Sequence, residues 1–474
     1  RDALAAAALV DQLAAEPLVE HVYREPILYP ASWPGAPFPT PLPAAPGDLP
    51  PATPSFVSMQ LSHGPTPDGH GVRAVAGVLG ARGRGVGHFM IETSWILDHQ
   101  ERGPLPAANF VGPVPAFNPA YSHHGASGTS IVMADRNRYG ITGIADEVDG
   151  RFVALELNGG YTNAIATVLA NGQPGDVVLV VLMTLVPSLG PGSWLPIEFF
   201  QSAFDATLTA TSNGFHLLLP AGNCNRSLDV PALLGRFDRN FRDSCSILVA
   251  SSQGGALQRA PYSNWGSRVD AHSWGDAVVA CGYGTLFFPN GDLRQTYTAA
   301  APGTSSSTPH LAGVVAALQG AARRQLGQPL LNAEILDLLH TVGPQTPDVI
   351  GRRPDLVGML QALGAIDGLT VAEPDVPLGG TIAAALDGPP NSIAALFGSF
   401  GTADRPLGFN RNVHLDLSAM VSLCAFVLTG APAPYALPVP NTSSLQDVDV
   451  YFQAVRLLGT QPLYVTNSCQ VTIL

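Results

Sequence analysis

Between about residues 55 and 367, short apolar runs alternate with longer stretches whose apolar residues recur at helical spacing. The short runs predict buried strands at His88–Ile91, Val177–Met183, Phe215–Leu219 and Ile247–Ala250. The longer stretches predict helices at Ile197–Thr211 and Ser307–Gly320. Strands that alternate with helices favour an α/β fold, in which helices flank a mostly parallel sheet.

The pattern changes after about residue 371, where apolar and polar positions alternate one by one. This alternation covers residues 413–417, 448–452 and 471–473, and turns rich in Pro and Gly separate the segments. A period of two residues is typical of strands with one buried face. We therefore predict a small all-β sandwich over residues 371–474.

The N-terminal part has a third pattern. Leucines at helical spacing in an Ala-rich stretch, followed by alternation over residues 19–23, predict a helix and then a strand within residues 1–28. Residues 29–54 are rich in proline and predict an extended linker. The chain is thus expected to divide into residues 1–54, an α/β domain at 55–367 and the β-domain at 371–474.

Composition excludes several classes of function. A formal net charge of −13 argues against nucleic-acid binding, which needs a basic surface. No apolar run reaches the roughly 18 residues of a membrane span. The chain contains no lysine, which excludes a Ser-Lys dyad, a Schiff-base lysine and a P-loop.

The five cysteines give a weaker signal. None forms a CxxC pair, so a zinc site is not expected. Cys424 and Cys469 lie in the same predicted β-domain and could form a disulfide, which would leave at least one thiol of the odd number unpaired.

The segment Gly303–His310 carries the strongest chemical signal. Ser305 lies just before a predicted apolar helix, and Pro309 suits a first helical turn. Unpaired N–H groups and the positive end of the helix dipole would stabilise an oxyanion beside this hydroxyl. An ordinary Ser or Thr N-cap explains the segment about equally well by itself.

Two further segments supply the partners that a nucleophilic serine needs. His123-His124-Gly125 offers an imidazole that could act as a base, although an exposed loop histidine is the commoner explanation. Asn223 follows the predicted strand Phe215–Leu219, where its amide could donate to an oxyanion. A simple Gly-Asn turn explains that residue as well.

In this order and at this wide spacing, His-Gly, Ala-Gly-Asn and Gly-Thr-Ser-x-x-x-Pro resemble the subtilisin-like serine peptidases over roughly residues 55 to 340. The resemblance implies that Ser305 attacks a peptide carbonyl, His124 is its base, and Asn223 and the Ser305 N–H bind the oxyanion. It also implies a secreted enzyme with a protein or peptide substrate.

The acidic member of the triad departs from the family pattern. The position that matches the family's Asp is Glu92, at the end of the strand His88–Ile91, and Ser94 stands where a Gly is usual. A glutamate can accept from the imidazole Nδ1–H as an aspartate does. Asp98 and a degraded triad are the alternatives that the sequence leaves open.

The resemblance also suggests how substrate is held. Ser188-Leu189-Gly190 matches the edge that binds extended peptides as an added strand. The P1 pocket would lie between Leu189-Gly190 and Ala221-Gly222. These two segments contain no acidic residue that could bind a basic P1 side chain, so we expect the enzyme to prefer apolar P1 side chains.

Residues 14–23 look like the end of a propeptide, which would make the chain a zymogen with an inhibitory arm or a cleavage site near residues 25–55. A plain N-terminal extension is the alternative. No cofactor is expected. Family members often bind structural calcium, but Asp135, Asn137 and Asp146 do not have a diagnostic spacing, so no metal is assigned.

Three other functions compete with a peptidase. The substitutions at Glu92 and Ser94 favour a pseudoprotease that binds without turnover. The β-domain could instead lead an adhesive protein with a surface or polymer ligand, and the same nucleophile could serve an esterase.

Overall fold

The structure is a computed structural model that describes residues 12–13, 28–30, 53–101, 107–406 and 410–474. A six-stranded sheet lies at the centre of the larger domain, and all its neighbouring strands are parallel. Its strands, in spatial order, are β3 (Asp149–Ala154), β2 (Gly87–Glu92), β4 (Val177–Val180), β7 (His216–Pro220), β8 (Ile247–Ser252) and β9 (Ala271–Trp274).

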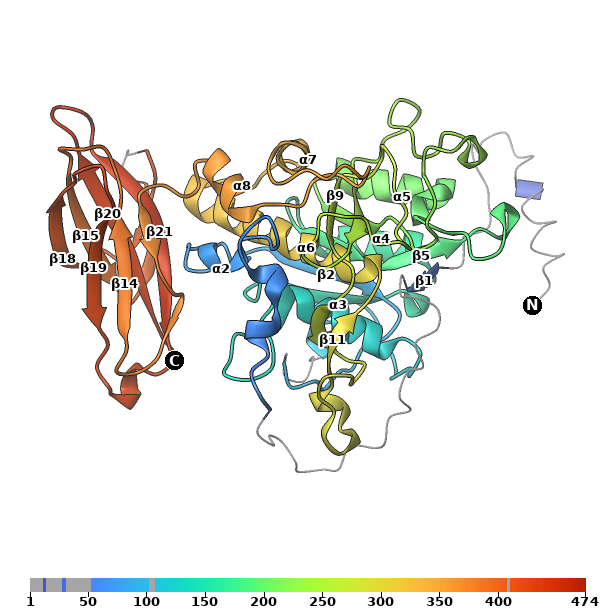
Figure 1. The fold of residues 1–474 in the computed structure, drawn as a ribbon, viewed down its shortest axis with the longest axis horizontal. Helices are drawn as coiled ribbons and strands as arrows, with labels where there is room; N and C mark the ends of the chain where they lie inside the picture. Colours follow the sequence, from blue (N-terminus) through green and yellow to red (C-terminus); the bar gives the residue numbers. More distant parts are fainter. Residues whose placement is uncertain (1–11, 14–27, 31–52, 102–106, 407–409) are drawn as a thin grey trace.

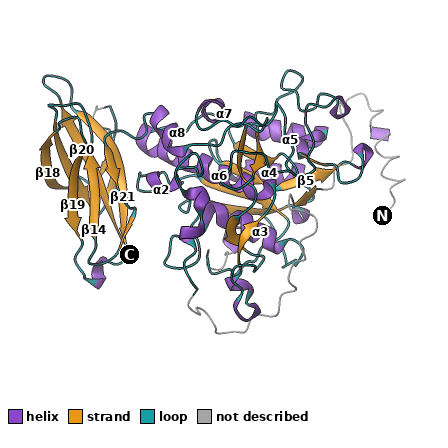
Figure 2. Cartoon of the chain, in the orientation of Figure 1, coloured by secondary structure: helices purple, strands orange, loops and turns teal. Residues whose placement is uncertain are grey.

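Helices cover both faces of this sheet because its strands are apolar on both sides (Figures 1 and 2). Met90, Leu179 and Leu218 point to one face, where they pack against α2 (Val72–Val75), α3 (Ser122–Met133), α6 (Thr304–Ala321), α7 (Asn332–Thr341) and α8 (Leu356–Ala362). Their neighbours along the strands point to the other face and pack against α4 (Tyr161–Asn171) and α5 (Gln201–Ser212). The predicted α/β fold with a mostly parallel sheet is confirmed.

Two small antiparallel sheets lie beside the central one. The first contains β1 (Leu28–Pro30), β5 (Leu182–Leu185) and β6 (Trp194–Leu195), and the second contains β10 (Val278–Cys281) and β11 (Tyr297–Ala301). The sequence predicted one strand over Val177–Met183, but the chain leaves the central sheet after Val180 and pairs β5 with β1 instead. Pro30, which we assigned to the linker, is the last residue of β1.

Several helices begin at other residues than predicted. The helix expected over Ile197–Thr211 is split, because Phe200 has the extended angles φ −87° and ψ 140°, and α5 starts at Gln201. Helix α6 starts at Thr304, since Gly303 with φ 95° interrupts the chain just before it. Pro309 therefore lies inside α6 and not in its first turn.

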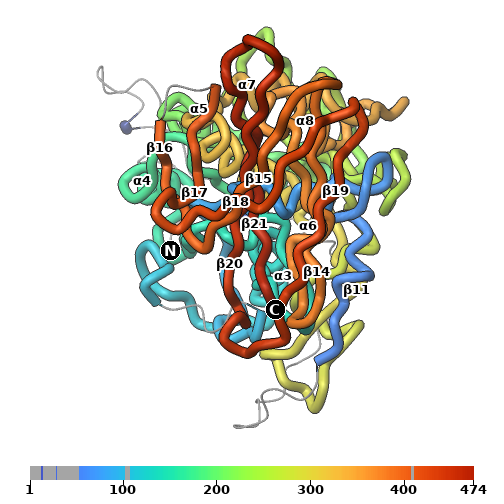
Figure 3. Tube along the Cα trace, turned by 90° about the vertical axis from the view of Figure 1, so that its left-hand side faces the viewer, coloured from blue at the N-terminus to red at the C-terminus, as the bar shows by residue number. Residues whose placement is uncertain are grey.

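The C-terminal part is the predicted β-sandwich, which is confirmed (Figures 1 and 3). One sheet contains β13 (Asp375–Val376), β21 (Tyr464–Ile473), β20 (Val448–Leu457), β15 (Ile393–Ser399) and β18 (Val421–Val427). It packs its apolar face against β12 (Leu369–Val371), β14 (Thr381–Leu386) and β19 (Ala433–Pro438), with β16 (Thr402–Arg405) and β17 (Val413–Leu415) beside them. The domain limits given above, with the segment at residues 1–54 largely outside the described residues, stay predictions.

The disulfide considered between Cys424 and Cys469 is absent, and both thiols are free. Cys424 lies on β18 and Cys469 on β21, and β15 and β20 separate these two strands. Three strand spacings place the residues about 14 Å apart, well beyond the reach of a disulfide.

The two domains are joined by main-chain hydrogen bonds. The Leu79 N–H donates to the Ser468 carbonyl at 3.0 Å, and the Gln470 N–H donates to the Gly77 carbonyl at 2.7 Å. The buried Gln325 amide, in the π-helical turn that follows α6, donates to the carbonyls of Leu79 and Ser468. Residues 77–79 thus pair along β21, so the C-terminal domain packs directly against the larger domain.

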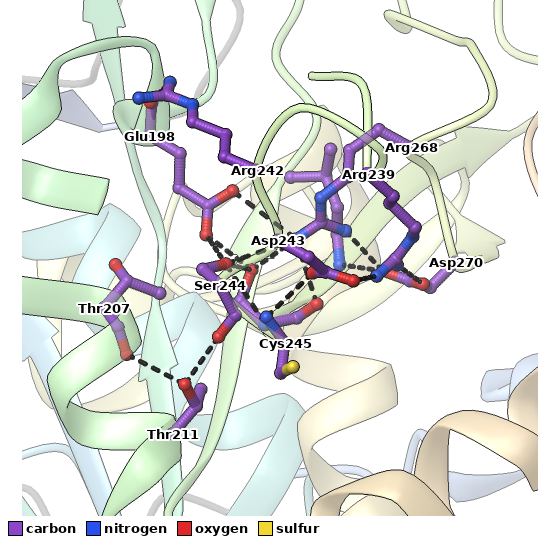
Figure 4. A network of polar contacts seen from close by, with 12 residues as sticks. Glu198, Thr207, Thr211, Arg239, Arg242, Asp243, Ser244, Cys245, Arg268 and Asp270 are labelled. Carbon is purple, nitrogen blue, oxygen red and sulfur yellow. Dashed lines mark hydrogen bonds and ion pairs between the residues drawn. The ribbon is translucent and has the colours of Figure 1, made fainter. Parts of the chain in front are cut away.

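Figure 4 shows a network of charges at the end of the sheet where β8 and β9 begin. Arg268 is 2% exposed and lies between two buried carboxylates. Its Nη1 donates to Asp270 at 2.8 Å, and its Nη2 lies 3.4 Å from the Glu198 carboxylate. The Asp270 carboxylate also accepts a hydrogen bond from the Leu248 N–H, so the network is bonded directly to the backbone of strand β8.

We expect the Arg268→Met variant to lose about 3–5 kcal/mol of unfolding free energy, because the buried Glu198 would lose its ion-pair partner. The matched control is Arg239→Met, since Arg239 is 28% exposed and also pairs with Asp270. That loss should be about 1 kcal/mol at most. Urea unfolding of both variants measures the difference, and equal losses would refute a special role for the buried guanidinium.

Several buried histidines make stability depend on pH. Burial lowers the pKa of His216 and His310 to about 4 and the pKa of His272 to about 3. The unfolded chain binds these protons near pH 6.5, so between pH 6.5 and 4 it holds more protons than the native protein. Stability is therefore retained above pH 6.5 and lost as the pH falls towards 4.

We expect each such histidine to cost on the order of 3 kcal/mol at pH 4. The test is the urea midpoint between pH 7 and 4 for His272→Gln, which should flatten the pH dependence. The control is a substitution of His340, which is 45% exposed. An unchanged slope in His272→Gln would contradict the expectation.

Candidate active site

Glu92 is the last residue of β2 and is fully buried. Its Oε1 accepts the Thr93 N–H at 2.6 Å and the Thr93 hydroxyl at 3.0 Å. Its Oε2 contacts Nδ1 of His124. The two bonds from Thr93 fix the carboxylate, so one oxygen is held and the other faces the imidazole.

His124 lies in the first turn of α3, which starts at Ser122, and not in an exposed loop. Two glycines let this helix approach its neighbours. A Cβ on Gly125 would lie 2.1 Å from the Ser94 carbonyl, and one on Gly128 would lie 2.7 Å from the Met90 side chain. This close packing brings His124 against the end of β2. Asp98, the alternative acid, is exposed.

Ser305 lies in the first turn of α6 and is 5% exposed. Helices α3 and α6 pack together, but no hydrogen bond joins Ser305 and His124. The Ser305 hydroxyl donates instead to the Pro302 carbonyl at 3.4 Å. The buried His124 Nε2 has no hydrogen-bond partner among the described residues. The structure thus packs the two helices that carry His124 and Ser305 against each other and leaves Nε2 of the imidazole unpaired.

Asn223 follows β7 through Ala221 and Gly222, as its position in the sequence suggested. Its Oδ1 accepts both the N–H of Thr304, at 3.1 Å, and the Thr304 hydroxyl, at 2.9 Å. Because the oxygen is held in this way, the NH2 end of the amide is the one that can donate to a bound group. Thr304 directly precedes Ser305, so the amide and the hydroxyl belong to one cluster.

The predicted substrate wall has a different local structure from the one expected. Ser188, Leu189 and Gly190 follow β5, but Pro187–Leu189 forms a 3-10 turn. The N–H groups of Leu189 and Gly190 donate within this turn, at 3.0 Å each. Because these two N–H groups already donate within the turn, they are not available to a peptide strand in this conformation. The role of this segment in binding extended peptides stays a prediction.

The contact between His123 and Tyr283, next to the candidate base His124, could not be predicted from the sequence. The Tyr283 N–H donates to Nδ1 of His123 at 3.0 Å, and the two rings stack with their centroids 5.9 Å apart. Tyr283 has a positive φ of 60°, which is unusual for a bulky residue. Burial lowers the pKa of His123 to about 4, so this histidine is a neutral support for α3. Its place beside His124 was the only signal in the sequence.

The residues considered for calcium are engaged in other contacts. Arg82 forms an ion pair with Asp146, and the Asn137 amide donates to Glu101 at 3.3 Å. Among the residues that the structure describes, no cluster of three His, Cys, Asp or Glu side chains could hold a metal ion. In the same residues, no helix combines the length and apolarity of a membrane span.

Comparison with known proteins adds to this geometry. Residues 114–341 match the model of the subtilase family, a match that begins after Glu92. Subtilisin-like protease 3 of Trichophyton equinum is 27% identical over 148 residues, which cover 31% of this chain and 30% of that protein. An extracellular protease of Xanthomonas campestris is 27% identical over 239 residues, which cover 47% of this chain and 37% of that protein. The chain spans about a third of the length of these curated relatives.

Two solved structures are also similar. A protease of Pseudoalteromonas arctica is 18% identical, with a TM-score of 0.48, and the match covers 65% of this chain and 98% of that one. A cold-adapted subtilisin-like serine proteinase is 22% identical, with a TM-score of 0.39, and the match covers 58% of this chain and 88% of that one. Residues 114–341 of this chain are therefore similar to the subtilase family.

Proposed function

We propose that this chain is a secreted serine endopeptidase that cleaves peptide bonds with Ser305, His124 and Glu92. One observation supports this most. A buried carboxylate contacts Nδ1 of His124, while Nε2 of the same ring lacks a partner, and the helix that carries His124 packs against the helix that carries Ser305. This is the arrangement that a base needs in order to take a proton from a hydroxyl.

In the proposed first step, Ser305 Oγ rotates away from the Pro302 carbonyl towards His124 Nε2. Oγ then forms a bond to the carbonyl carbon of the substrate, and its proton passes to Nε2. Glu92 accepts the Nδ1–H and stabilises the imidazolium that results. Thr93 contributes by holding the carboxylate in place through two hydrogen bonds.

The negative charge that develops on the carbonyl oxygen is stabilised from two sides. The Asn223 amide and the Ser305 N–H, in the first turn of α6, are the proposed donors. The C–N bond then breaks, and the leaving amine takes the proton from His124. Water hydrolyses the acyl-enzyme through the same groups in reverse.

A fluorophosphonate probe tests the proposal, because it labels only an activated serine. We expect labelling that mass spectrometry assigns to Ser305, together with cleavage of casein. Labelling without peptide cleavage, but with hydrolysis of small esters, would point to an esterase. A processed sample that is neither labelled nor active would support the pseudoprotease.

We propose that residues 1–54 act as a propeptide. The described part of that segment supports this, because Leu28–Pro30 pair with β5, which leads directly to the predicted substrate wall. The relative named an extracellular protease supports export. N-terminal sequencing of the active protein from the culture medium tests both, and an active form that still contains residues 1–54 would refute processing.

We also propose that the C-terminal domain binds a surface or polymer. A pocket of about 250 Å³ between β15, β17 and β20 supports this, and its wall is almost entirely apolar, including Phe397, Leu415, Leu417 and Val455. Such a wall favours apolar polymers over hydroxylated ones. Full-length Ser305→Ala protein should bind an apolar resin, and a further Leu417→Asp substitution should weaken this binding. Equal binding by the proteins with and without Leu417→Asp would refute a binding role for the pocket.

A further inference from the structure

Arg226 lies three residues after the proposed oxyanion donor Asn223 and reaches across to the loop that follows β5. Its Nη2 donates to the Leu189 carbonyl and to the Ser193 hydroxyl, both at 3.1 Å. Its positive charge also lowers the pKa of the Cys224 thiol, against the larger effect of burial. The guanidinium therefore lies beside the residue that directly follows Asn223.

A buried asparagine fixes the backbone on which Arg226 stands. Asn264 Oδ1 accepts the N–H groups of Cys224 and Arg226, at 3.1 Å and 3.0 Å. Its Nδ2 donates to the carbonyls of Ala221 and Trp194, each at 2.8 Å. The segment at residues 221–226 and the loop between β5 and β6 are thus locked together on either side of Arg226.

The charge of Arg226 is not neutralised within the described part of the chain, where no carboxylate forms an ion pair with it. Both hydrogen bonds use Nη2, which leaves the N–H groups of Nε and Nη1 for solvent or a ligand. The side chain is half-buried, so a bound anion would be partly shielded from water. A planar guanidinium with two remaining donors suits a carboxylate.

The position of the Arg226 guanidinium relative to Asn223 decides which part of a bound substrate would contact it. A peptide whose scissile carbonyl oxygen faces the Asn223 amide carries its P1 side chain on the adjacent carbon. That side chain would extend over the residues next to Asn223, where Arg226 contacts Leu189. The sequence-based expectation of apolar P1 residues considered only the two wall segments, and Arg226 lies in neither.

We propose that Arg226 is a specificity-determining residue that selects substrates with an acidic P1 side chain, glutamate in particular. This rests on the proposed peptidase function of Ser305. Glutamate fits better than aspartate because its longer chain reaches a guanidinium that is held back by Leu189 and Ser193.

The test compares two peptide substrates that differ only in Glu or Gln at P1. We expect kcat/KM to be about 10- to 100-fold higher for Glu in the wild-type protein, the range of a charge-assisted hydrogen bond. Higher salt should reduce this ratio. Arg226→Gln should bring it close to one, and Arg226→Glu should favour a P1 arginine over a P1 glutamate.

The matched control is Arg259→Gln, which removes the same charge nearby. Arg259 donates to Asn225 of the same loop and stands over the Trp265 ring, but it does not contact the loop after β5. A general electrostatic effect would change the Glu/Gln ratio equally in both variants and would overturn the proposal. A purely structural clamp would lower both rates in Arg226→Gln and keep their ratio, which would overturn it as well.

The two hypotheses fail in different ways. If wild-type protein cleaves the Glu and Gln peptides equally well, Arg226 does not select P1 and the peptidase assignment stands. If no peptide is cleaved and the fluorophosphonate probe does not label Ser305, the proposed function itself is wrong.

Discussion

We expect the Ser305→Ala variant to lose about 10⁶-fold in kcat on a peptide substrate, the loss seen when the nucleophile of a related serine peptidase is removed. Without the hydroxyl, no acyl-enzyme can form, and His124 has no proton to take. The Asn223 amide and the helix start would remain, so a small rate above that in water should persist. The measurement is kcat with a chromogenic peptide on protein of verified fold.

Ser306→Ala is the matched control for this variant. Ser306 is the next residue of α6, is similarly buried, and donates to the same Pro302 carbonyl, at 3.2 Å. Its removal should change kcat only a few-fold. If Ser305→Ala keeps more than about one hundredth of the activity while its melting temperature is unchanged, Ser305 is not the nucleophile.

The second large effect is expected for Glu92→Gln, which should lower kcat by about 10⁴-fold. The two bonds from Thr93 would hold the amide oxygen where Oε1 now lies. The NH2 group would then face Nδ1 of His124 and force it to accept a hydrogen bond. That tautomer carries its proton on Nε2 and cannot take one from Ser305.

Two companions make the Glu92 experiment specific. Glu92→Asp retracts the carboxylate by about 1.5 Å and should also lose activity, because the contact with His124 opens. Asp98→Asn changes the exposed alternative acid and should have no effect. A loss of activity in Asp98→Asn, with Glu92→Gln unaffected, would reassign the acid.

Much of the fold could be predicted from the period of the apolar positions. Strands such as Ile247–Ser252 are apolar on both faces, and this pattern belongs to a sheet covered on both sides. The sequence also pointed to Asn223 and Glu92 as strand-end residues, because the apolar runs stop just before them. The start of α6 was placed less well, since the positive φ of Gly303, and not the period of the apolar residues, decides where this helix begins.

The parts of the candidate site that depend on distant contacts were not visible in the sequence. Nothing local predicts that Thr304 holds the Asn223 amide, or that Arg226 reaches Leu189. The 3-10 turn at Pro187–Leu189 was also missed, because the motif resembled a segment that is extended in the family. These features arise where two loops meet, and the pattern along one segment does not describe such contacts.

The pairing of residues 77–79 with β21 sets the order in which this protein can fold. Arg84 and Tyr451, which form a hydrogen bond beside this pairing, are 367 residues apart in the chain. The edge at Gly77 stays unpaired until β21, nearly 400 residues later, has been synthesised, and contacts of such long separation form slowly. Closure of this edge of the larger domain is thus coupled to the completion of the C-terminal sheet, and a chain that lacks β21 keeps an open edge prone to aggregation.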